Sequence, residues 1–82
     1  MTYSIVNHYN HGTKQCEIAC FKDFTSAKEF AKKCFTRHLT ELPEGDYIEV
    51  TENPVGKTFA QGKAILRFRP EDPTHFQDLR LL

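Results

Sequence analysis

The chain of 82 residues has no long hydrophobic run, no excess charge of either sign and no recognisable catalytic motif. Its apolar runs are far shorter than the roughly 20 residues that span a bilayer, and its polar N-terminus lacks a signal-peptide core. Eleven basic residues balance eleven acidic ones, so no overall field draws the protein to nucleic acid or anionic lipid. We therefore expect a cytoplasmic protein with no membrane partner.

Cysteine is odd in number, with three residues and no secretory signal, so we expect reduced thiols rather than a disulfide framework. Cys16 and Cys20 lie four residues apart on a predicted strand, which separates them by about 13 Å. That distance excludes a shared zinc ion or a disulfide between them. Cys34, on the inward side of a predicted helix, could approach either one. We interpret all three as small buried thiols, and we expect no metal and no cofactor.

What the sequence does contain is the composition of one small globular domain, with 39% hydrophobic and 27% charged residues. Alternation predicts strands over Tyr3–Tyr9 and Lys14–Phe21, joined by a tight hairpin that turns at His11-Gly12. In this register the inward-facing pairs are Asn7 with Cys16, Ile5 with Ile18, and Tyr3 with Cys20.

A single amphipathic helix follows the hairpin, because apolar residues recur there at steps of three and four. These inward residues are Ala27, Phe30, Ala31, Cys34, Phe35, His38 and Leu39. The opposite side carries Lys28, Glu29, Lys32, Lys33 and Arg37. Ser26 and Glu29 fit a capping box, with Thr25 as a competing cap, and Pro43 and Gly45 close the segment.

Two further strands are predicted over Tyr47–Glu52 and Lys63–Arg69, with Ala64, Leu66 and Phe68 pointing inward in the second. Residues Thr58–Gly62 either begin that strand, with Gly62 as a bulge, or belong to a loop. The predicted fold is α+β: a four-stranded, mostly antiparallel β-β-α-β-β sheet with the helix on one face. Residues 1–69 form the core of this single domain.

Residues 70–82 form a C-terminal appendage, in which Asp72-Pro73 is able to start a short helix. Its apolar side chains either dock on the core or mediate dimerisation. They are Phe76, Leu79, Leu81 and Leu82.

Nothing in the sequence predicts an enzyme. Gly56-Lys57-Thr58 matches the end of a phosphate-binding loop, but the earlier glycine that the loop requires falls at Thr51, inside a strand. A nucleophilic Cys/His pair such as Cys34 and His38 needs a third group to orient the imidazole, and no flanking motif suggests one.

The strongest candidate site is the sheet face that the helix leaves uncovered, where Arg67 and Arg69 project side by side. Tyrosine and arginine are enriched at the energetically dominant positions of protein interfaces. A solvated face with a cross-strand Glu49–Arg67 pair is the simpler interpretation. The candidate partner-binding residues are Tyr47, Glu49, Ile65, Arg67 and Arg69, with Lys32 and Arg37 on the helix.

In length, in the Tyr3–Phe21 hairpin, in the helix start Phe24–Ala31 and in the closing strands, the chain resembles small phage-encoded β-β-α-β-β proteins that include anti-CRISPR inhibitors. The resemblance implies a monomeric or homodimeric stoichiometric blocker of a host defence complex, acting in the host cytoplasm. We expect a non-enzymatic inhibitor or adaptor that binds a larger protein. A nucleic-acid-binding accessory domain is the alternative, and a thiol-dependent enzyme or metal-binding regulator is a third.

Overall fold

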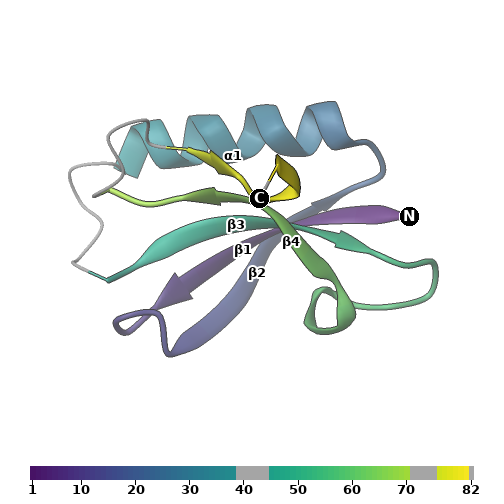
Figure 1. Cartoon of the computed structure of the whole chain (residues 1–82), viewed down its shortest axis with the longest axis horizontal. Helices are drawn as coiled ribbons and strands as arrows, with labels where there is room; N and C mark the ends of the chain where they lie inside the picture. The colour runs from purple at the N-terminus through teal and green to yellow at the C-terminus, as the bar shows by residue number, and fades with distance from the viewer. Residues whose placement is uncertain (39–44, 71–75, 82) are drawn as a thin grey trace.

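The computed structural model describes residues 1–38, 45–70 and 76–81, and of residues 36–38 it describes the backbone alone. One helix, α1 (Phe24–His38), lies across one face of a five-stranded antiparallel sheet (Figure 1). The strands are β1 (Thr2–Tyr9), β2 (Lys14–Phe21), β3 (Tyr47–Asn53), β4 (Lys63–Phe68) and β5 (Gln77–Asp78), in the spatial order β2-β1-β3-β4-β5. The predicted α+β class and the β-β-α-β-β order are confirmed.

The core lies between α1 and the sheet. Ala27 and Ala31 are fully buried, and their small side chains let the helix backbone approach the strands closely. Phe35 packs on Phe68 with ring centroids 5.5 Å apart, in a tilted arrangement that aromatic pairs favour. The strand residues buried in this core cluster are Ile5, Ile48, Val50, Ile65, Leu66 and Phe68.

The helix starts earlier than the capping-box prediction placed it. Asp23 is the capping residue, because its Oδ2 accepts a hydrogen bond from the Ser26 backbone N–H at 2.8 Å and its carbonyl accepts one from Ala27. This bond from Ser26 lowers the pKa of the Asp23 carboxyl below its ordinary value. The predicted closure at Pro43 lies outside the described residues.

The first hairpin has the predicted turn. His11 and Gly12 occupy its centre with φ of 60° and 81°, and the Thr13 N–H donates to the Asn10 carbonyl at 3.2 Å. Asn7 is opposite Cys16, as predicted. Beyond that pair the predicted register is wrong, because a bulge inserts Ile18.

The bulge places Ala19 opposite Ile5 and Phe21 opposite Tyr3, so Ala19 and Phe21 pack toward the core. Ile18 is 46% exposed instead of inward-facing. Cys16 and Cys20 are also exposed and Cys34 is only partly buried, which corrects the prediction of three buried thiols.

A second register shift lies between Val50 and Thr51 on β3. Ala64 pairs with Thr51 and Leu66 pairs with Val50, which leaves Ile65 as the extra residue of β4. Ile65 is 2% exposed and belongs to the core cluster, although strict alternation places it on the uncovered face. Thr58–Gly62 does not begin β4, which starts at Lys63. It belongs to the loop between β3 and β4, the second predicted alternative, and within it Phe59–Gln61 forms the 3₁₀ turn η1.

The C-terminal segment docks on the domain. Phe76 packs against Phe68 with centroids 5.5 Å apart, and β5 pairs with β4 as a fifth strand that the sequence did not predict. Leu79–Leu81 forms a 3₁₀ turn, η2. The predicted helix start at Asp72-Pro73 lies outside the described residues. Among the described residues, no helix is long and apolar enough to cross a membrane.

Candidate protein-binding face

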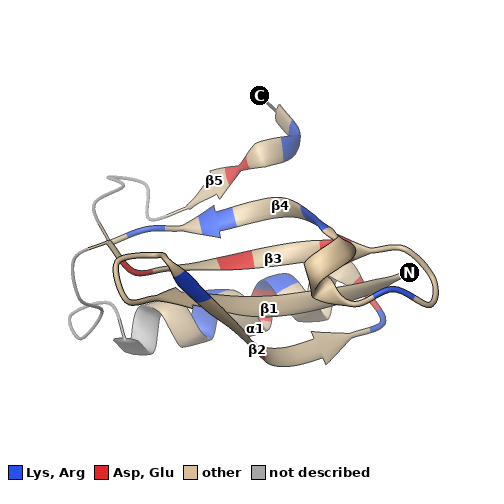
Figure 2. Cartoon of the chain, turned by 90° about the horizontal axis from the view of Figure 1, so that it is seen from below, with Lys and Arg blue, Asp and Glu red and all other residues tan. Residues whose placement is uncertain are grey.

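The sheet face turned away from α1 is called the open face (Figure 2). It is built as rows of side chains that cross the strands. One row runs from His8 on β1 to Tyr47 on β3, which are direct partners in the ladder. The next row runs from Val6 to Glu49 and on to Arg67 on β4. Antiparallel pairing brings these side chains together from segments about forty residues apart in the sequence.

Tyr47 is held on the open face by its neighbours in the row. The His8 ring stacks on the Tyr47 ring at 4.3 Å between centroids and 8° between planes. Arg69, which follows β4, places its guanidinium carbon 4.2 Å from the centroid of the same ring, and that of Arg67 is 5.6 Å away. Since β3 lies between β1 and β4, His8 and Arg69 approach Tyr47 from opposite sides. We call His8, Tyr47, Arg67 and Arg69 the Tyr47 cluster.

Gly12 at the hairpin tip fixes one edge of the Tyr47 ring. A Cβ on Gly12 would lie 3.0 Å from Cε1 of Tyr47, and the φ of 81° is in the left-handed region that favours glycine. The His11 backbone N–H also donates to Asp46 Oδ1 at 3.1 Å, which ties the turn to the residue before Tyr47. The hairpin therefore supports the position of the ring.

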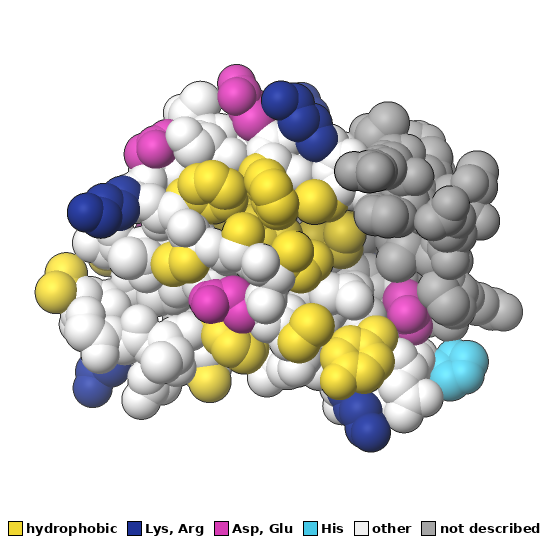
Figure 3. All heavy atoms as spheres, turned by 180° about the vertical axis from the view of Figure 1, so that it is seen from behind, with side chains coloured by type: hydrophobic (Ala, Val, Ile, Leu, Met, Phe, Trp, Pro, Cys, Tyr) yellow, Lys and Arg dark blue, Asp and Glu magenta, His cyan; other side chains and the backbone are white. Residues whose placement is uncertain are grey.

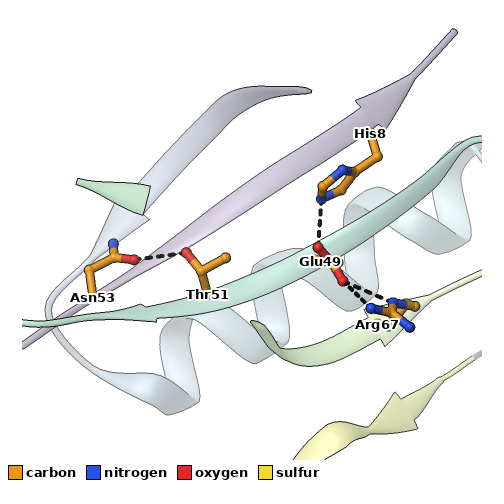
Figure 4. Close-up of polar contacts among 5 residues, drawn as sticks. All are labelled: His8, Glu49, Thr51, Asn53 and Arg67. Carbon is orange, nitrogen blue, oxygen red and sulfur yellow. Dashed lines mark hydrogen bonds and ion pairs between the residues drawn. The ribbon is translucent and has the colours of Figure 1, made fainter. Parts of the chain in front are cut away.

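Glu49 lies between His8 and Arg67 on the open face and is only 6% exposed (Figure 4). Its Oε2 accepts from Arg67 Nε at 2.8 Å and from Arg67 Nη2 at 2.7 Å. Its Oε1 lies 2.6 Å from His8 Nε2, a contact that is an ion pair when the imidazole is protonated. A carboxylate this buried needs such partners, because desolvation disfavours its charged form. Glu49 is thus a support for Arg67 and His8 rather than a contact group.

A second polar network lies farther along the open face. Asn53 is 1% exposed and donates from Nδ2 to the hydroxyl oxygens of Ser4 at 2.7 Å and Thr2 at 3.2 Å. Its Oδ1 accepts from Thr51 at 2.9 Å (Figure 4). The Ser4 hydroxyl in turn donates to Glu17 on β2 at 2.6 Å. The network joins β1, β2 and β3 by side chains as well as by the ladder.

The predicted site residues divide into three groups. Tyr47 and Arg69 are half-buried and Arg67 has a side chain that is 28% exposed, so these three present atoms to solvent. Glu49 and Ile65 are buried. Lys32 is exposed on α1, across the sheet from the Tyr47 cluster, so a partner on the open face does not reach it without wrapping around the domain. The Arg37 side chain lies outside the described residues.

His8 is the functional candidate that sequence reasoning left out of the site. The alternation of the two strands already places His8 and Tyr47 on the same face, so His8 could have been included from the sequence. No group of three His, Cys, Asp or Glu side chains suited to a metal occurs in the described part of the chain.

The fold and site define a small antiparallel α+β domain with an aromatic and cationic sheet face. Comparison of the chain with protein-family models, with curated proteins and with solved structures found no match.

Proposed function

We propose that the chain is a non-enzymatic inhibitor or adaptor that binds a larger protein through the Tyr47 cluster. The observation that supports this proposal most is the Tyr47 ring held between His8 at 4.3 Å and Arg69 at 4.2 Å on the open face. Tyrosine and arginine contribute large shares of binding energy in interfaces. A ring already fixed by its neighbours loses little conformational entropy when a partner covers it.

The charges of the cluster indicate what kind of surface fits it. Two guanidinium groups, Arg67 and Arg69, accompany the single carboxylate of Glu49, and that carboxylate is directed at Arg67. An acidic region on the partner complements this excess of positive charge and speeds association. The resemblance to small phage-encoded inhibitors extends the proposal to a host defence complex such as CRISPR-Cas, bound in the cytoplasm.

A nucleic-acid partner is less compatible with the same geometry. Bases bind sheet faces by stacking on aromatic rings. The Tyr47 ring already carries His8 on one side and Arg69 on the other, so a base stacks there only if one of them moves. The neutral net charge also removes the general attraction to phosphate.

Affinity capture tests the proposal. The tagged chain is incubated with lysate of its native or host cell, with and without nuclease, and retained proteins are identified by mass spectrometry. We expect a protein that survives nuclease and is lost with Tyr47→Ala, whose fold is checked by circular dichroism. Retention that disappears with nuclease favours the nucleic-acid alternative, and retention by Tyr47→Ala equal to wild type places the contact elsewhere.

A further inference from the structure

The two edges of the sheet differ, and the proposed function involves neither edge. At one edge the chain covers β4 with its own C-terminal segment, since β5 pairs with β4 and Phe76 packs on Phe68. At the other edge, no described residue pairs with the outer side of β2 (Figure 2). An unpaired strand edge presents backbone donors and acceptors that form a template for another strand.

Most side chains along this free edge are exposed, and they mix apolar with polar groups. Six of the eight residues of β2 are exposed, among them Ile18 at 46%. Beside them, Phe21 and Phe30 of α1 meet with centroids 5.3 Å apart and remain partly uncovered. Figure 3 views the molecule from this side and shows hydrophobic side chains gathered in the middle of the face. We call Ile18, Phe21, Phe30 and the partly buried Cys34 the β2 patch.

We propose that β2 pairs antiparallel with β2 of a second copy of this chain, so that two β2 patches meet across a two-fold axis. A surface that binds its own copy must be complementary to itself. The edge carries both signs of charge, with Lys14 at the start of β2, Glu17 within it, and Lys22 followed by Asp23 after its end. Charges of both signs along the edge allow opposite charges to meet when two copies pair antiparallel.

The net charge and the opposite edge both favour a dimer. A formal net charge of zero leaves no overall repulsion between copies. Pairing through β2 uses the eight-residue edge of each copy, and the edges that remain are those of the two-residue strand β5. The assembly therefore closes at two chains instead of growing into a fibre. Because Ile18 is the extra residue of a bulge, the pairing uses the stretch of β2 on one side of it.

Sedimentation equilibrium over a range of concentrations tests this inference. We expect the wild type to reach twice the chain mass of 9.5 kDa, and Ile18→Lys to stay at the single-chain mass. Val55→Lys is the matched control, because Val55 is an 82% exposed apolar residue in the turn between β3 and β4. It introduces the same side chain away from the edge and is expected to dimerise like wild type.

Hydrogen exchange locates the contact independently of any substitution. In the dimer we expect slower exchange at β2 amides as concentration rises, with no change in the turn around Val55. A wild type that remains monomeric at every concentration overturns the inference. So does a dimer that Ile18→Lys leaves intact. Because the Tyr47 cluster lies on the open face, failure of this dimer leaves the proposed function standing.

Discussion

Arg67 contacts the carboxylate oxygen Oε2 of Glu49 with two nitrogens, Nε at 2.8 Å and Nη2 at 2.7 Å. Glu49 is almost completely buried. Removing Arg67 leaves Glu49 with the His8 contact alone among the described residues. We expect Arg67→Ala to lower the free energy of unfolding by about 1–3 kcal/mol, the usual cost of a buried polar group that loses its partner. Urea unfolding at neutral pH measures the change.

The double variant Glu49→Gln with Arg67→Ala provides the control. If the two side chains act as a pair, the double variant loses less free energy of unfolding than the two single variants lose together. A loss in the double variant equal to the sum of the two single losses would show that Glu49 and Arg67 are not energetically coupled. For the same reason Arg67→Glu is a poor probe of binding, because it sets two carboxylates against each other on neighbouring strands.

A steric prediction concerns Gly62 and Asn53. A Cβ on Gly62 would lie 2.1 Å from Asn53 Oδ1 and 3.0 Å from the Glu52 carbonyl oxygen. The φ of Gly62 is −84°, which any residue adopts, so the effect of Gly62→Ala is steric alone. We expect a loss of about 1–3 kcal/mol of unfolding free energy, as for other overpacked sites. Unchanged thermal unfolding of Gly62→Ala would mean that Asn53 does not form the Ser4 and Thr51 bonds described.

The cap of α1 predicts a dependence of stability on pH. The Ser26 N–H lowers the pKa of the Asp23 carboxyl in the folded chain, so its contribution is present above the ordinary range of a carboxyl group. It is lost as the pH falls through the folded-state pKa. We expect Asp23→Ala to reduce stability at neutral pH and to differ less from wild type in acid. Urea unfolding at both pH values tests this, and an equal difference at both would contradict it.

Element order could be predicted from the sequence because alternation and helical periodicity extend over whole segments. The face of α1 that packs inward, with Ala27 and Ala31 at its centre, follows from the same periodicity. The register beyond Cys16 could not be predicted, because one extra residue at Ile18 reverses which side chains face the core. Asp23 was missed as the cap since Thr25 and Ser26 are equally suitable residue types.

For the candidate site, the Glu49–Arg67 pair was predicted, because it depends only on which residues face each other across two strands. The stacking of His8 and Arg69 on Tyr47 depends on side-chain rotamers, which alternation does not specify. The strand β5 has two residues, too few for any period to be visible.

The most direct test of the central claim is the affinity of the captured partner for Arg69→Glu, measured beside wild type and beside Lys57→Glu. Lys57 is exposed in the turn between β3 and β4, so its variant makes the same charge change outside the Tyr47 cluster. We predict that Arg69→Glu weakens binding by at least about tenfold, as expected for an interface arginine, while Lys57→Glu binds like wild type. Equal affinities for all three chains would contradict binding through the Tyr47 cluster.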